Sequence, residues 1–66
     1  MRVGRVIVAN PDTDSVSVLD ARSGRVVRHI SVGHAPQTVA VDEQTARIFV
    51  ANAGDNTVSV LDAARL

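Results

Sequence analysis

An internal repeat with a spacing of 42 residues constrains the fold of this chain more than any other feature. The segment Arg5–Asn10 recurs as Arg47–Asn52, and Ser15–Ala21 recurs as Thr57–Ala63, with no gap between the two pairs. Ten of the 20 aligned positions are identical, whereas unrelated segments would share about one or two. A period of about 40–45 residues with four short strands per unit is the length class of β-propeller blades.

Short Val-rich runs separated by turn-forming residues predict strands. We expect six of them, at Arg5–Asn10, Ser15–Asp20, Arg25–Val32, Thr38–Asp42, Arg47–Asn52 and Thr57–Asp62. No segment shows the sustained 3.6-residue apolar period of an amphipathic helix. The strands that begin at Arg5 and Arg47 are apolar at both alternating sets of positions. This pattern predicts a sheet that is covered on both faces.

Polar turn formers and glycines lie between the expected strands. The residues that we assign to structural turns are Asn10, Asp20, Gly24, Gly33, Pro36, Asn52 and Asp62. We expect the Asp20 carboxylate to accept backbone N–H groups and Gly24 to supply a positive φ. Asn10 and Asn52 are expected to cap backbone groups at the strand ends. Because the Asn and Asp residues recur at equivalent positions, a structural role is favoured over a catalytic one.

The composition excludes several classes of function. The formal net charge is zero, so nothing predicts a nucleic-acid or anionic-membrane partner. There is no Cys, which excludes disulfides and thiolate metal sites. No apolar run approaches the roughly 18 residues of a membrane span. Phe49 is the single aromatic residue, which leaves base stacking and aromatic cages without support. We therefore expect no nucleic-acid partner and no membrane span.

The pattern Asn10-x-Asp12-x-Asp14 superficially resembles the start of a calcium loop. Such a loop requires glycine at position 15 and a bidentate acid at position 21, where this chain has Ser15 and Ala21. The second copy does not repeat the acid spacing. A hairpin turn is the better interpretation, and we expect no metal or other cofactor.

Two side chains remain as candidate ligand contacts. His34 lies in the Gly33–Pro36 loop, and binding sites concentrate on such loops. Asp42 ends an expected inner strand and would lie near a central channel. A metal needs three or more convergent ligands, and the sequence offers neither residue a second cluster. We predict no catalytic residue in this chain, and the residues do not point to an enzyme.

Four segments together resemble the YVTN family of β-propeller repeats: Val8–Asn10, Val16–Asp20, Val32–Asp42 and Val50–Asn52. The resemblance covers the chain after residue 4. It implies an all-β fragment of a propeller, with six short antiparallel strands in two adjacent incomplete blades across residues 1–66. Residues 5–33 would supply the second to fourth strands of one blade, and residues 34–62 the first to third strands of the next. The remaining blades would come from a longer protein or from a homo-oligomer.

The resemblance also implies a function. A propeller of this kind would act as a structural and interaction scaffold that binds a protein or a small ligand on a rim or in its channel. Members of the family are often exported or displayed at the cell surface, so the resemblance alone suggests an extracytoplasmic location. The alternative is part of a propeller enzyme, quinoprotein-dehydrogenase-like or lactonase-like, whose active site is not contained in this chain.

The turn Gln44-Thr45-Ala46 departs from the family, which often has glycine before the second strand of a blade. An alanine held at positive φ would cost about 1 kcal/mol. We therefore expect this turn to differ from that of the family.

Overall fold

The computed structural model describes residues 4–66 and is an all-β structure. Its strands are β1 (Arg5–Asn10), β2 (Ser15–Asp20), β3 (Val26–Ser31), β4 (Pro36–Asp42), β5 (Arg47–Asn52) and β6 (Thr57–Asp62). Two short 3-10 turns follow β1 and β6, namely η1 (Pro11–Thr13) and η2 (Ala63–Arg65). The predicted all-β class with six strands is confirmed. Four strands have the expected bounds, β3 is one residue shorter at each end, and β4 begins two residues earlier.

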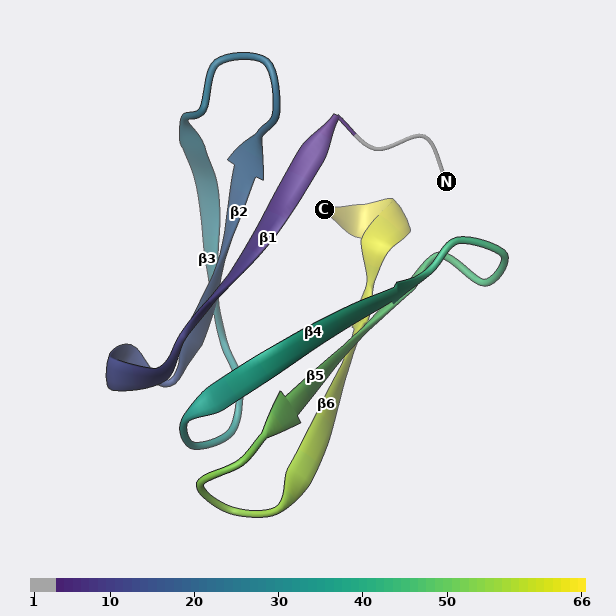
Figure 1. Ribbon diagram of the computed structural model, residues 1–66. Coiled ribbons are helices and arrows are strands. Elements are labelled where there is room, and N and C mark those ends of the chain that lie inside the picture. The colour runs from purple at the N-terminus through teal and green to yellow at the C-terminus, as the bar shows by residue number, and fades with distance from the viewer. Residues whose placement is uncertain (1–3) are drawn as a thin grey trace.

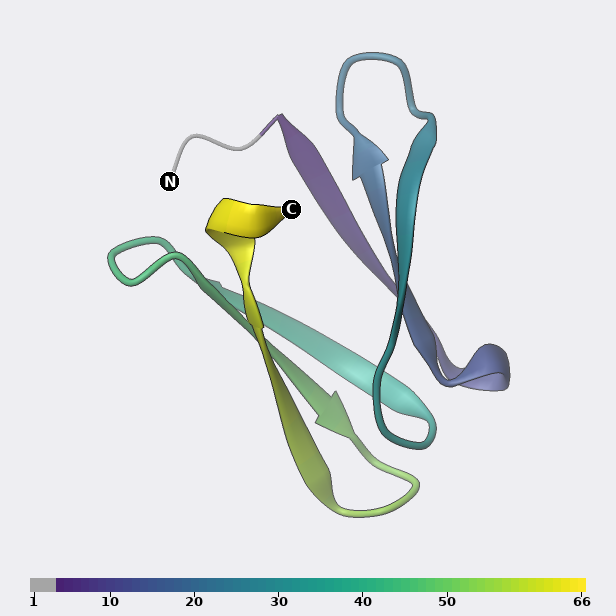
Figure 2. The same cartoon turned by 180° about the vertical axis from the view of Figure 1, so that it is seen from behind.

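The strands form two antiparallel three-stranded sheets, with the orders β1-β2-β3 and β4-β5-β6. We call them the first sheet and the second sheet. In Figures 1 and 2 they form a wedge that is closed near the loop between β3 and β4 and open at the other end, where η2 lies between them. Each sheet therefore has one face turned toward the other sheet and one face turned away.

The two copies of the repeat fold alike. The six residue pairs between β1 and β2 recur unchanged, 42 residues later, between β5 and β6. The turns within these hairpins also correspond, because Asp14 and Asn56 both adopt the left-handed conformation, with φ of 54° and 57°. Sequence identity in the strands is thus matched by identity of register.

Asp20 and Asp62 close the turns that follow β2 and β6. Asp20 Oδ1 accepts a hydrogen bond from the backbone N–H of Arg22 at 2.8 Å, and Asp62 Oδ1 accepts one from that of Ala64 at 3.0 Å. Gly24, later in the first of these turns, has φ of 73°. The same carboxylate geometry in both copies gives the repetition of Asp a structural reason.

Asn10 and Asn52 bind strand hydroxyls, where we expected them to cap backbone groups. Asn10 Nδ2 donates to Ser17 Oγ at 2.8 Å, and Asn52 Nδ2 donates to Ser59 Oγ at 2.9 Å. Each amide makes a second contact with the hydroxyl of the first residue in the neighbouring strand. The antiparallel register places these hydroxyls beside the amide on one face of the sheet, so they are its nearest acceptors.

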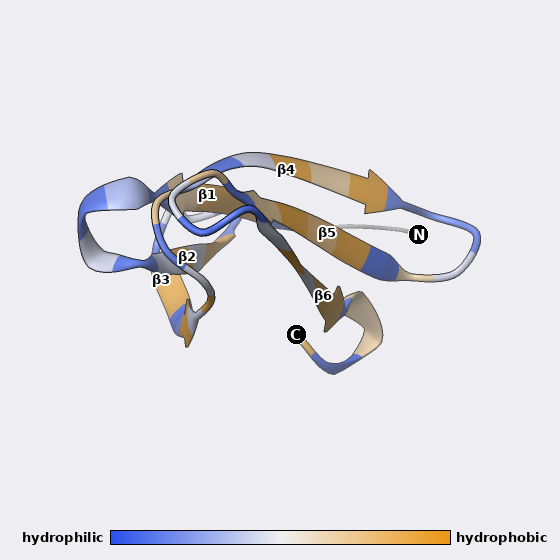
Figure 3. Cartoon of the chain, turned by 90° about the horizontal axis from the view of Figure 1, so that it is seen from below, coloured by the Kyte–Doolittle hydropathy of each residue, from blue (hydrophilic) through white to orange (hydrophobic). Residues whose placement is uncertain are grey.

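A small apolar core holds the two sheets together. Its centre consists of Val16 from β2 and of Ile48 and Val50 from β5, all buried. Partly buried residues surround them, namely Ile7, Ile30, Val32, Val39, Leu61, Ala63 and Leu66. Figure 3 shows that apolar residues follow the strands while the loops are hydrophilic. Full burial of a Val or Ile side chain contributes about 1.5–3 kcal/mol, so these few residues carry much of the stability.

Gly33 lies directly over the side chain of Asn52. Asn52 is 1 % exposed, and its Oδ1 has no hydrogen-bond partner. A Cβ added at Gly33 would lie only 2.7 Å from Asn52 Cγ. Because Asn52 is enclosed by the core, it cannot move aside, and only glycine fits above it.

Substitution of Gly33 by alanine is expected to lower the free energy of unfolding by about 1–3 kcal/mol, because the added methyl group overpacks this site. Gly4→Ala is the matched control, since nothing lies within 4 Å of a Cβ built there. That change should stay within about 0.5 kcal/mol of the parent. Urea unfolding followed by circular dichroism measures both. Equal effects of the two substitutions would contradict the steric account.

Ala46 precedes β5 and has φ of 56°. It therefore adopts the left-handed conformation despite its Cβ, which is unfavourable for an L-residue. Glycine at this position would not carry that strain.

The variant Ala46→Gly should raise the free energy of unfolding by about 1 kcal/mol, because glycine occupies this conformation without a steric cost. Ala40→Gly, at an exposed position of β4, is the opposite control. It should lower stability by about 0.5–1 kcal/mol, since glycine loses more entropy in a strand. The same urea titration distinguishes them, and destabilisation by Ala46→Gly would refute the argument.

Candidate functional site

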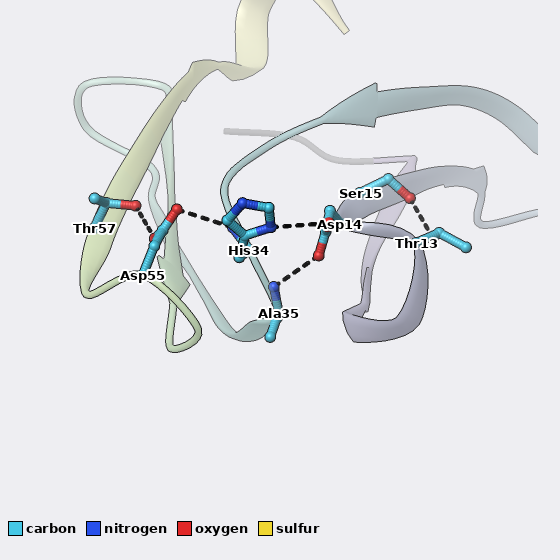
Figure 4. Close-up of polar contacts among 7 residues, drawn as sticks. All are labelled: Thr13, Asp14, Ser15, His34, Ala35, Asp55 and Thr57. Carbon is cyan, nitrogen blue, oxygen red and sulfur yellow. Dashed lines mark hydrogen bonds and ion pairs between the residues drawn. The ribbon is translucent and has the colours of Figure 1, made fainter.

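The loop that joins β3 to β4 is connected to hairpin turns of both copies through His34. Asp14, in the turn of the first copy, places Oδ2 3.1 Å from His34 Nδ1 and accepts the backbone N–H of Ala35 through Oδ1 at 2.9 Å. Asp55, in the turn of the second copy, accepts the backbone N–H of His34 at 3.1 Å and the hydroxyl of Thr57. Figure 4 shows His34 between Asp55 and Asp14. We call His34, Asp14 and Asp55 the rim cluster.

The rim cluster faces solvent. The side chains of His34 and Asp14 are 72 % and 44 % exposed. Ion pairs at such exposure are screened by water and contribute little to stability. Within residues 4–66, no group of three or more His, Cys, Asp and Glu side chains is arranged to hold a metal ion. The rim cluster therefore positions three loops relative to one another, and it offers a ligand one imidazole and two carboxylates.

Asp42, the second candidate from the sequence, lies elsewhere. It ends β4, whereas His34 precedes the beginning of that strand, so the structure does not bring the two together. Asp42 Oδ1 accepts the backbone N–H of Gln44 at 3.0 Å. Hydrogen bonds from the hydroxyl of Thr45 and then from Gln44 lower the pKa of Asp42 below its ordinary value. These contacts close the turn between β4 and β5.

Sequence reasoning missed the partners of His34. Asp14 was considered only as part of a calcium-loop pattern, and Asp55 was not singled out. Both residues lie in hairpin turns of the repeat, and this shared location was a signal that could have pointed to them. They do not occupy equivalent positions of the two copies. Asp55 aligns with Thr13 of the first copy. In that copy, Thr13 and Ser15 form a hydroxyl pair at 2.9 Å in place of the contact between Asp55 and Thr57.

A cleft of about 1030 Å³ lies between the two sheets at the open end of the wedge. Apolar side chains from both sheets line it, including Ile7, Val39 and Ile48. Arg5 and Asp20 stand among the charged residues of its lining. The cleft and the rim cluster lie at opposite ends of the strands, so they are separate features.

The faces of the sheets that are turned away from each other carry exposed apolar residues. On the first sheet this face contains Val6, Val8 and the half-buried Leu19, which we call the first open face, and Asn10, Ser17 and His29 lie beside them on the same face. On the second sheet it contains the half-buried Phe49 and the exposed Ala51, Val58 and Val60, which we call the second open face. Apolar residues gathered on one surface indicate a binding site more strongly than scattered ones do.

A scan against models of known protein families finds no match, and a search of curated proteins finds no similar sequence. The resemblance to the YVTN repeats stays a prediction from the residues. Among residues 4–66, no helix is long and apolar enough to cross a membrane.

Hydrogen bonds in the rim cluster favour the charged forms of both carboxylates. The backbone N–H of Ala35, and after it the His34 side chain, lower the pKa of Asp14. The hydroxyl of Thr57, and after it the backbone of His34, lower the pKa of Asp55. Each carboxylate is thus held by the fold more strongly when it is ionised.

Because the folded pKa values lie below the ordinary ones, the two carboxylates stabilise the fold above about pH 4. This contribution should disappear as the pH falls through the folded pKa values. Asp14→Asn is expected to reduce the loss of stability in acid, since its amide cannot titrate. Thermal unfolding between neutral and acidic pH measures the effect. An unchanged acid dependence in Asp14→Asn would contradict the assignment.

Proposed function

We propose that this chain is a repeat module of a β-propeller of the YVTN type and that it acts as a structural and interaction scaffold. One observation carries this proposal: the two copies of the repeat stack through opposite faces of their sheets. The first copy contributes Val16, and the second contributes Ile48 and Val50. These residues come from different strands of the repeat. The contact therefore joins one surface of the first copy to a different surface of the second copy.

A contact of this kind continues when further copies are added. Each sheet uses one face toward the preceding copy and the other toward the following copy, which is how the sheets of a propeller pack around an axis. The apolar pattern on both sides of β1 and β5 suits such stacking. The four strands β1 to β4 make up one period of the repeat, the number found in a propeller blade.

The rim cluster supports the interaction part of the proposal. Loops that rigid sheets position are common binding sites, and here His34 joins a loop to turns of both copies. The strands repeat closely, whereas the turns differ in their side chains, as Asp14 and Asn56 show. A scaffold that binds a protein or a small ligand would vary such turns while it keeps its strands. An extracytoplasmic location belongs to this proposal through the resemblance only.

Tandem arrays of residues 5–46 test the ring. With about 4–8 linked copies, we expect one number to give a compact monomer with a higher unfolding midpoint than the numbers on either side. Ring closure covers the last two open faces, and only one number of copies satisfies its geometry. Light scattering gives the mass, and urea titration gives the midpoint.

Arrays that carry Val16→Asp in every copy are the control and should not fold, because each contact between copies would bury an unpaired carboxylate. A midpoint that rises steadily with copy number, without a preferred number, would indicate an open array and would contradict the propeller.

A further inference from the structure

We propose that the second open face of one chain docks on the first open face of a second copy of this chain, head to tail, in the arrangement that the two sheets have within one chain. The inference rests on the proposed function, because it takes the two copies of the repeat as equivalent. It goes further in naming the occupant of the open faces, which is another molecule of the same protein.

Each large exposed residue of the second open face has a buried counterpart 42 residues earlier. Val58 is 62 % exposed, whereas Val16 is 0 % exposed; Val60 is 55 % exposed, whereas Val18 is 0 % exposed. The registers around them are identical. The second open face therefore has the shape and chemistry of a surface that already lies inside an interface.

The first open face has the complementary property. Val6 is 47 % exposed and its counterpart Ile48 is 1 % exposed, while Val8 is 41 % exposed and its counterpart Val50 is 0 % exposed. Over β1 and β2 this face thus corresponds to the surface of β5 and β6 that receives Val16 within the chain, while Val39 of β4 has no counterpart in the first sheet. A second copy can reproduce the central contact by placing Val58 between Val6 and Val8.

The centre of the second open face contains no charge that docking would bury. Its cross-strand pairs are Ala40–Phe49, Phe49–Val60 and Ala51–Val58. Isolated charges are costly to transfer from water, so their absence from these pairs favours a protein surface as the occupant.

The polar residues beside the first open face are compatible with burial. Asn10 Nδ2 donates to Ser17 Oγ, and Ser17 Oγ also lies 3.1 Å from His29 Nδ1. The equivalent pair of Asn52 and Ser59 has the same hydrogen bond, and Asn52 is 1 % exposed in the interface between the sheets even though its Oδ1 has no partner among the described residues. The interface within the chain thus already covers this amide, whose N–H group is hydrogen-bonded to its own sheet.

The two open faces differ, so the contact is heterologous. Each chain would offer its second open face to one neighbour and its first open face to another. Such contacts build closed rings or open filaments, in contrast to two-fold dimers.

Sedimentation velocity of the 7.0 kDa chain tests the inference directly. From about 1 μM to about 1 mM, we expect the mass to rise in whole multiples of one chain. Val58→Asp and Val6→Asp should each weaken self-association at least about 100-fold, because a carboxylate would be buried without a partner. An equimolar mixture of these two variants should form a heterodimer and stop there, since only one intact pair of faces remains.

Val41→Asp is the matched control. Val41 is 45 % exposed and pairs with Ile48, so it lies on the face of the second sheet that is turned toward the first sheet, outside both open faces. It should associate like the parent. If circular dichroism shows that an aspartate variant has lost its strands, Val58→Thr keeps a β-branched side chain and should still weaken association about 10-fold.

Three results would overturn the inference: a parent chain that stays monomeric at every concentration, a mixture of the two aspartate variants that does not form the heterodimer, or sensitivity to Val58→Asp without sensitivity to Val6→Asp. The last result would indicate a contact between like faces. Failure of this inference is distinguishable from failure of the proposed function, because tandem arrays present the same faces within one polypeptide. If the tandem arrays form closed rings while the parent chain stays monomeric, only the inference about self-association is overturned.

Discussion

The contact of Val16 with Ile48 and Val50 is the interaction on which the rest of the molecule depends. A chain of this length buries only about 60 % of the surface that its unfolded form exposes, so few residues can be fully covered. The buried apolar residues Val16, Ile48 and Val50 lie where the two sheets meet, and each sheet keeps exposed apolar residues on its second face. This division of each sheet into a covered and an open face is what the proposed repeat module requires, because the stability of stacked repeats increases with every neighbour.

Polar contacts at the closed end of the wedge determine how the two copies are placed relative to each other. The loop at His34 reaches Asp14 on one side and Asp55 on the other, while Gly33 passes close above Asn52. The exposed contacts add little energy, since water screens them. Their effect is geometric: they hold three loops at one rim, where a scaffold would present its binding residues.

Much of the local structure could be read from residue patterns. Val-rich runs located the strands, and β4 begins earlier than expected because it continues to Pro36 across a β-bulge at Gln37 that alternation does not reveal. The turn at Asp20 and Gly24 followed from their own conformational preferences. The roles of Asn10 and Asn52 could not be read in this way. Their acceptors, Ser17 and Ser59, become neighbours only when the register is known.

Three properties follow from the sequence alone: the repeat, the all-β class and the apolar character of the strands on both sides. These properties are local, because they depend only on the order of side chains along the backbone. Folding in three dimensions decided which face of each sheet is covered, and which turn residues meet His34. A strand that is apolar on both sides carries no information about which side will find a partner. That choice belongs to the packing of one copy against the next, where Val16 is buried and its equivalent Val58 is left open.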